Sequence, residues 1–318
     1  MSRLTDLQRE LQDASAAIAH AERTVSSHPG VASVAATLRT IQKRRERLEE
    51  EFFAVANEMG LDVCDYRIEL DDRPATIAGL TAVLATFQRV FTSVYDALVR
   101  GPKLTSKTSA ETADATAFGF AYTFPGSVGV MMTLPNERLL LGATKLDEAM
   151  DTTLELLGAS DPEKLQGMTA RVGLPAVRFA HQWAIENARA GYGADIAWIR
   201  NSEVRRELRL QLPQIAKLAS SIKGVTAKEE VVVIGELLDV KLSDHTFSMK
   251  VKDKTIFGQF TDAIGASHPA LLPKTYRAVL HVMQKVVVED GKEEVTYFLL
   301  RLDEPTEEQT LFLSELPK

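Results

Sequence analysis

Hydrophobic residues in the first 60 positions recur every three or four residues, the repeat of amphipathic helices that pack along a narrow seam. The pattern breaks between Ser26 and Gly30, where Pro29 and Gly30 stop a helix. It predicts an antiparallel, coiled-coil-like helical hairpin over residues 1–60. The seam packs either on the chain's own core or on a partner, and its charged flanks favour the partner. The residues of this partner-binding seam are Leu4, Leu7, Leu11, Ile18, Leu38, Ile41 and Leu48.

A basic cluster lies near the middle of the second predicted helix. Its five cations precede three glutamates: Arg39, Lys43, Arg44, Arg45 and Arg47 come before Glu49, Glu50 and Glu51. Such a run is usually a solvated helix face with ion pairs four residues apart, here from Arg45 to Glu49 and from Arg47 to Glu51. A contact with nucleic-acid phosphates is the alternative. We favour the solvated face.

Large and small residues alternate from Ala117 to Leu134 on both sides of a Pro125-Gly126 turn, and this pattern predicts a β-hairpin. An odd number of loop residues keeps the large side chains on one face. The pairs expected are then Phe124 with Val128, Tyr122 with Val130, Phe120 with Met132 and Phe118 with Leu134. We expect this aromatic face to pack on a helix over Ile77–Leu98. The small face permits close approach by a helix, a partner or a ligand, and a helix is favoured.

Residues 62–226 otherwise mix helix and strand signals, so we predict a central mixed α/β domain built on the hairpin. A capping box at Thr144 and Asp147 opens one helix, and Asp161-Pro162 opens the next. The polar stretch 103–116 is interpreted as a mobile loop or a surface strand. The remaining elements expected are strands over 62–70 and 194–200, helices up to 157, over about 162–172 and over about 175–190, and a strand-like stretch at about 208 leading into a helix that ends at 222.

Five strand candidates follow between residues 228 and 304, with a long connection after the third. This order and the Asp290-Gly291 turn signal predict a five-stranded small β-barrel of OB or SH3 type. A capping box at Thr306 and Gln309 predicts a short docking helix over residues 305–318. The fold class expected is therefore α+β and multidomain: hairpin 1–60, mixed domain 62–226, barrel 228–304 and docking helix.

A barrel of the OB type raises the possibility of nucleic-acid binding, because such barrels hold single strands with aromatic and basic side chains. The candidates for that role are Phe247, Lys250, Lys252, Lys254 and Arg277. Residues 228–318 carry 11 Lys and Arg against 16 Asp and Glu, a net charge of 11 − 16 = −5, so the usual attraction is missing. We expect the aromatic residues to fill the barrel interior instead.

The charge and the residue composition limit the kinds of site that the protein can contain. A net charge of −7 argues against a general polyanion binder. The chain has a single cysteine, Cys64, which excludes an internal disulfide and a zinc site with several thiolates. We expect the Cys64 side chain to be buried. His181 and Glu186 are five residues apart, which is not the spacing of a zinc pair on a helix, and with Asp195 they form the one set worth inspecting. Ser127 lacks the Gly-x-Ser-x-Gly spacing of a nucleophile elbow.

We therefore predict a non-enzymatic interaction or assembly protein that oligomerises or binds a protein partner through the hairpin. The alternative is a nucleic-acid-binding protein that uses the barrel. The third hypothesis is an enzyme of unfamiliar type with a site in the central domain. No cofactor or metal is expected. The polar N-terminus lacks a signal-peptide core, and no run approaches about 18 uninterrupted apolar residues, so we expect a cytoplasmic protein without membrane contact.

Overall fold

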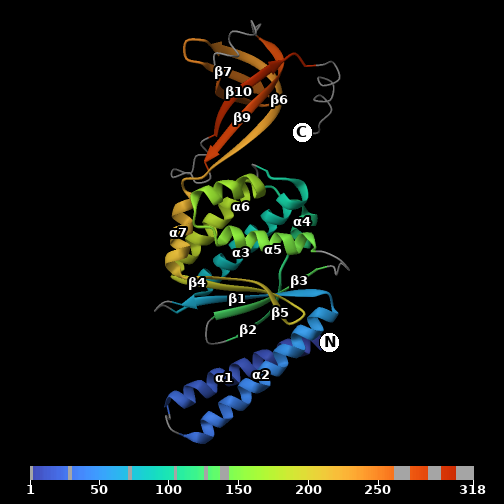
Figure 1. The fold of residues 1–318 in the computed structure, drawn as a ribbon, viewed down its shortest axis with the longest axis vertical. Coiled ribbons are helices and arrows are strands. Elements are labelled where there is room, and N and C mark those ends of the chain that lie inside the picture. Colours follow the sequence, from blue (N-terminus) through green and yellow to red (C-terminus); the bar gives the residue numbers. More distant parts are fainter. Residues whose placement is uncertain are drawn as a thin grey trace. The chain divides into compact units, whose positions relative to one another are not determined.

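The structure of the chain, a computed structural model, describes residues 3–27, 31–70, 74–103, 106–124, 128–136, 143–260, 273–285 and 295–305. These residues form seven helices and two sheets, one of them a closed five-stranded barrel, so the predicted α+β class is confirmed (Figure 1). The chain divides into two compact units, Met1–Ile222 (unit 1) and Lys223–Lys318 (unit 2).

Unit 1 is organised around a five-stranded sheet in which every neighbouring pair is antiparallel. Across the sheet the strands are β2 (Gly119–Phe124), β3 (Val128–Pro135), β1 (Leu61–Leu70), β4 (Tyr192–Arg200) and β5 (Glu203–Leu210). The central strand β1 has a nearly continuous run of buried residues, whereas β5 is almost wholly exposed. A central strand needs cover on both faces, and the helices of unit 1 supply it on opposite sides (Figure 1).

The helices α3, α5, α6 and α7 cover one face of this sheet (Figure 1). Their bounds are Ile77–Arg100, Lys145–Leu157, Pro162–Ala190 and Leu212–Ile222. Tyr66 of β1 packs its ring edge against Phe87 of α3, with 5.1 Å between ring centroids. Among the helices described, α3 has the length and apolar composition of a membrane span, a test that core helices also pass. The burial of Phe87, Val90 and Phe91 indicates a core helix.

The predicted N-caps of α5 and α6 are confirmed: Thr144 forms a complete capping box with Asp147, and Asp161 caps α6. At the start of α3, the Thr76 side chain accepts a hydrogen bond from the Gly79 amide. The two helices expected on either side of residue 173 are present within α6, where Gly173 interrupts the helical backbone with a φ of 77°. The interpretation of residues 103–116 was wrong in part, because a short helix, α4 (Ala110–Ala115), forms there.

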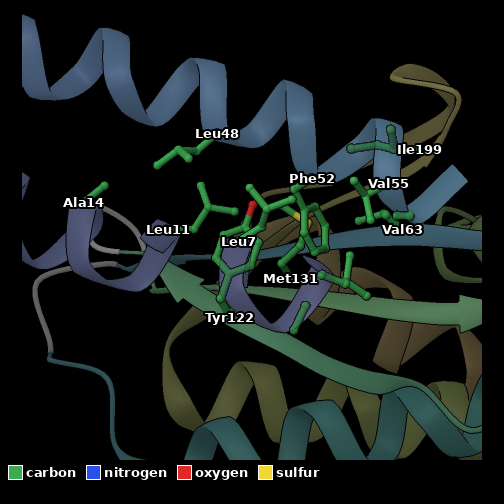
Figure 2. Packing of buried hydrophobic residues seen from close by; sticks show 13 residues of the cluster. Leu7, Leu11, Ala14, Leu48, Phe52, Val55, Val63, Tyr122, Met131 and Ile199 are labelled. Carbon is green, nitrogen blue, oxygen red and sulfur yellow. The ribbon is translucent and has the colours of Figure 1, made fainter. Parts of the chain in front are cut away.

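The helices α1 (Arg3–Ser27) and α2 (Ala32–Glu58) lie side by side across the other face of the sheet (Figure 1). They run in opposite directions, since Arg3 pairs with Glu51 at 2.8 Å and Glu10 with Arg44 at 3.2 Å. One end of the pair packs on the sheet, where its apolar side chains meet those of four strands (Figure 2). The labelled members of this cluster are Leu7, Leu11, Ala14, Leu48, Phe52, Val55, Val63, Tyr122, Met131 and Ile199.

The predicted register of the β2–β3 hairpin was wrong near its loop. Phe124 lies opposite Gly129 rather than Val128, and Tyr122 lies opposite Met131 rather than Val130; only the expected pair of Phe120 with Met132 is present. The pairing shifts by one residue at Ala121, between the two regions. A β-bulge of this kind inserts one extra residue into one strand, which turns the side chains beyond it to the other face.

The bulge divides the aromatic face that we expected to lie on α3. Phe118 does pack there, with its ring centroid 5.8 Å from that of Phe87 and 5.0 Å from that of Phe91. Tyr122 faces the opposite side and packs edge-on against Phe52 of α2, 5.3 Å away. Phe120 is left exposed. The second face of the hairpin is therefore covered by α1 and α2, as expected for a packed helix.

Unit 2 is the closed barrel. Its strands are β6 (Thr226–Lys241), β7 (Thr246–Val251), β8 (Lys254–Phe260), β9 (Lys274–Lys285) and β10 (Val295–Asp303). Around the barrel the order is β6-β7-β8-β10-β9, and the ring closes between β9 and β6. All neighbours are antiparallel except β8 and β10, which are parallel. The expected Asp290-Gly291 turn and the helix after residue 305 lie outside the described residues.

Candidate nucleic-acid interface

The barrel interior holds the aromatic candidate for binding, Phe247, together with two other aromatic residues of the barrel strands. Phe247 is 3% exposed, and Phe260 and Tyr276 are also buried. A Cβ atom at Gly258 of β8 would lie 2.5 Å from the Phe247 ring, so this glycine makes room for the phenylalanine inside the barrel. Phe247 therefore does not belong to a binding surface, because strand alternation directs it into the core.

A row of three flat side chains instead crosses the outer surface of β8, β10 and β9. Phe257 is 70% exposed, which is the consequence of its position between inward-facing neighbours such as Gly258. Phe298 lies opposite Gln259 of β8 and opposite His281 of β9, so it is diagonal to Phe257. His281 is exposed and Phe298 is half-buried. We call Phe257, Phe298 and His281 the aromatic row.

Three of the predicted cations lie beside this row. Lys250 of β7 is opposite Thr255 of β8, two pairs along from the pair of Ser248 with Phe257. Lys252 occupies the tight turn between the two strands with a φ of 54°, and Lys254 begins β8. All three lysines are exposed.

The other charges near the row limit its net positive character. Arg277 of β9 forms an ion pair with Asp303 at 3.0 Å, so its charge is already neutralised. Glu236 lies opposite Lys250, and Glu230 lies opposite His281. The surface therefore offers stacking area with few free cations. Sequence reasoning missed Phe298 and His281, although strand alternation alone contains the signal that they point outwards.

The seven seam residues of the hairpin fall into two groups. Leu4, Leu7, Leu11 and Leu48 belong to the cluster on the sheet and contact the chain's own core. Beyond that cluster, Ile18 is buried, whereas Leu38 and Ile41 are half-buried. A partner would therefore meet the distal part of the hairpin rather than its root on the sheet.

Unit 1 also contains a buried polar network that sequence reasoning did not find. Arg200 of β4 donates from Nε to Asp62 at 2.8 Å and from Nη1 to Asp147 at 3.1 Å, while its Nη2 donates to both carboxylates. Asn136 donates to the same two carboxylates at 2.6 Å and 3.1 Å, and it accepts from the Thr144 hydroxyl at 2.8 Å. The network joins three strands to the N-terminus of α5.

The ionisation of this network follows from its contacts. Burial alone would raise the pKa of Asp147, but hydrogen bonds from Arg200 and Thr144 hold it below its ordinary value. Hydrogen bonding to Asp62, and then to Asp147, raises the pKa of Arg200. Asp147 and Arg200 are thus both charged at neutral pH, and each finds its counter-charge inside the network. This arrangement is typical of a buried ion-pair network that holds secondary-structure elements together, rather than of a catalytic acid or base.

The other sequence candidates have ordinary surroundings. Glu186 pairs with Arg189 at 3.2 Å and Asp195 pairs with Arg209 at 2.7 Å, so each of these two carboxylates already has its own cation. Cys64 is fully buried, and burial raises the pKa of its thiol. Ser127 lies outside the described residues. Within the described ranges, no group of three or more His, Cys, Asp or Glu side chains is arranged to hold a metal ion.

Comparison with known proteins adds no relative. No protein family, no curated protein and no solved structure matches the chain. The class is therefore defined by the fold alone: an α+β protein with a helix-covered antiparallel sheet in one unit and a closed five-stranded barrel in the other.

Proposed function

We propose that this protein binds single-stranded nucleic acid on the outer surface of its barrel, and that the barrel is of the OB type. The strand order β6-β7-β8-β10-β9, with its single parallel pair, supports this assignment. OB barrels bind oligonucleotides on the face of their second and third strands, which here are β7 and β8. The exposed ring of Phe257, on the third strand, is the observation that carries the proposal.

The aromatic row suits bases rather than a folded partner. Each exposed ring can stack on one base, an interaction that contributes about 1–3 kcal/mol per base and tolerates any sequence. Neighbouring strands are about 4.8 Å apart, so rings on adjacent strands can engage successive bases of an extended strand. Lys250 and Lys254 both lie on the side of Phe257 towards the β7–β8 turn, where they can reach a phosphate next to a base stacked on Phe257.

The test compares the full chain with Phe257→Ala, using a fluorescently labelled oligothymidylate and anisotropy at low salt. We expect the substitution to weaken binding about 5- to 150-fold, the equivalent of one lost stacking contact. Phe120→Ala is the matched control, because it removes another exposed phenylalanine, from unit 1. Equal affinities for the two variants would contradict the proposal, as would a wild-type chain that does not bind at low salt.

A second proposal, assembly through the distal hairpin, is favoured by one observation. Leu38 and Ile41 continue the apolar seam of α2 but remain half-buried at the part of the helix that lies beside α1. A protein partner or a second copy of the chain would complete their burial. Sedimentation equilibrium of the full chain against Ile41→Gln tests this, with Ala36→Gln as an exposed control on the same helix. Identical monomer masses for all three would contradict self-assembly. With either function, we propose a cytoplasmic location.

A further inference from the structure

The charges of the distal hairpin differ from those of the rest of the chain. From Ala32 to Arg45, α2 contains four cations and no acidic residue. The facing stretch of α1, residues 9–22 as set by the pairing of Glu10 with Arg44, contains one Arg and three acidic residues. These two stretches together carry a net charge of 5 − 3 = +2 within a chain of net charge −7. A cluster of positive charge on an otherwise acidic protein is typical of a surface that binds an anionic ligand.

Three cations of α2 form a row along its exposed side. Arg39, Lys43 and Arg47 are each four residues apart, so successive side chains lie about 6 Å apart along the helix axis at 1.5 Å per residue. All three are exposed. Like charges at this spacing destabilise a helix slightly, so no local benefit to folding explains the row.

If this helix face were only solvated, we would expect two ion pairs along it, from Arg45 to Glu49 and from Arg47 to Glu51. The structure contains one of the two. Arg45 does pair with Glu49 at 2.6 Å, but Glu51 pairs with Arg3 instead of Arg47. Within the ranges that the structure describes, Arg39, Lys43 and Arg47 form no ion pair. Exposed Glu46 and Glu50 lie near Arg47, at the end of the row closer to the sheet. The distal end, with Arg39 and Lys43, is therefore the more strongly positive.

From these observations we infer that the row of Arg39, Lys43 and Arg47 is a second nucleic-acid contact, one that binds backbone phosphates. The inference rests on the proposed function for its class of ligand but not for its residues, since the row is in unit 1 and the aromatic row is in unit 2.

The composition of the helix face favours phosphates over other anionic partners. The exposed residues beside the row are small, Ala32, Ala36 and Thr40, so a nucleic-acid backbone can approach the helix closely. A membrane-surface helix presents large apolar side chains opposite its cations, and here that side of α2 packs on α1. A protein interface needs an apolar or aromatic centre, which this face does not have among its described residues. Phosphate contacts require only the cations.

The experiment measures salt dependence in the full-length protein. Binding of a labelled mixed-sequence single strand and of its duplex is titrated between 50 and 200 mM salt. Each phosphate contact contributes about 0.7 to the slope of log affinity against log salt for a single strand and about 0.9 for a duplex. We expect the triple variant Arg39→Gln, Lys43→Gln, Arg47→Gln to lower the slope by about 2 to 3. Wild-type affinity should then fall about 15- to 65-fold more than the variant's over this range.

A charge-matched triple variant is the control. Lys164→Gln, Arg171→Gln, Arg206→Gln removes the same charge from cations that already pair with acidic residues of α5. Equal slopes for the two triple variants would overturn the inference. Lys43→Gln alone, which leaves the helix otherwise intact, should lower the slope by about one.

The two proposals fail in different ways. If Phe257→Ala has no effect while the row variant loses salt dependence, the barrel proposal fails and the row stands. If Phe257→Ala weakens single-strand binding and the row variant matches its control, the row fails and the barrel proposal stands. A wild-type chain that binds neither strand nor duplex at 50 mM salt overturns both.

Discussion

The indole nitrogen of Trp183 donates a 2.9 Å hydrogen bond to the hydroxyl of Tyr66, and both side chains are completely buried. The bond ties α6 to the central strand of the sheet. Tyr66→Phe removes its acceptor and leaves a buried N–H group unpaired, so we expect a loss of about 1–3 kcal/mol in the free energy of unfolding. Urea denaturation measures it. Tyr95→Phe on half-buried α3 surface is the control, and an equal loss there would contradict this role.

The alkaline limit of stability should depend on buried tyrosines. Burial raises the pKa of Tyr66 and, together with the charge of Glu49, that of Tyr122. Above about pH 10 the unfolded chain releases these protons while the folded chain keeps them. Unfolding is then favoured, by up to about 1.4 kcal/mol per pH unit for each group.

Denaturant midpoints measured from pH 8 to pH 11 test this expectation. The raised pKa of the Cys64 thiol should start the decline earlier, near the ordinary thiol pKa of about 8.5, and Cys64→Ala should remove that early part. A stability that stays constant up to pH 11 would show that these hydroxyls titrate normally.

Arg200 should be far more important than its neighbour Arg206. Arg200→Met leaves the carboxylates of Asp62 and Asp147 inside the protein without their cation, and we expect a loss of about 3–5 kcal/mol. Arg206→Met breaks a solvent-exposed ion pair with Asp151, where water screens the two charges, and should leave the free energy of unfolding almost unchanged. Chemical denaturation of both variants at neutral pH compares their free energies of unfolding. Similar losses would argue against a structural role for the buried ion-pair network.

Two glycines of α6 should respond oppositely to alanine. Gly173 has a φ of 77°, and a Cβ there would lie 2.7 Å from the backbone nitrogen and oxygen of Lys103. Gly173→Ala should therefore cost about 2–4 kcal/mol through strain and displacement. Gly167 has open space around its Cβ position, so Gly167→Ala should gain about 0.5–1 kcal/mol. Thermal unfolding measures the stability of both variants. If Gly173→Ala were tolerated, the backbone at Lys103 would have to move aside at little cost.

The turn between β4 and β5 offers a stabilising substitution. Asn201 and Ser202 both have positive φ angles, 54° and 62°, as a type I′ turn requires. Asparagine adopts this conformation readily and serine does not, so Ser202→Gly should stabilise unit 1 by about 0.5–1 kcal/mol. Ser220→Gly within α7 should instead destabilise it slightly. The melting temperatures of the two variants should move in opposite directions.

Helix boundaries were predictable because their signals are local. Thr144 and Asp147 are three residues apart in the sequence and satisfy each other's backbone groups, so the capping box is visible without tertiary information. The bulge at Ala121 has no such signal. It depends on Tyr122 finding Phe52, a residue 70 positions earlier, and alternation alone favoured an unbroken strand.

The binding surface was less predictable than the strands that carry it. The alternation and turns indicated where the barrel strands lie, but the side of each strand that faces inward depends on register across the closed sheet. Phe247 and Phe257 are both aromatic residues in barrel strands, and only the packing of Phe247 against Gly258 separates core from surface. The Arg200 network was invisible for a similar reason, because its members come from three strands and a helix.

The bulge at Ala121 also affects how the molecule behaves in concentrated solution. An edge strand is a template for adding another chain's strand, which is how aggregates of folded proteins begin. The β2 edge has an exposed Phe120 and no charged residue, but the bulge bends it away from a straight ladder. The opposite edge, β5, carries charges at five of its eight positions. Both edges thus disfavour a sixth strand, which leaves helix surfaces as the route by which copies of unit 1 can associate.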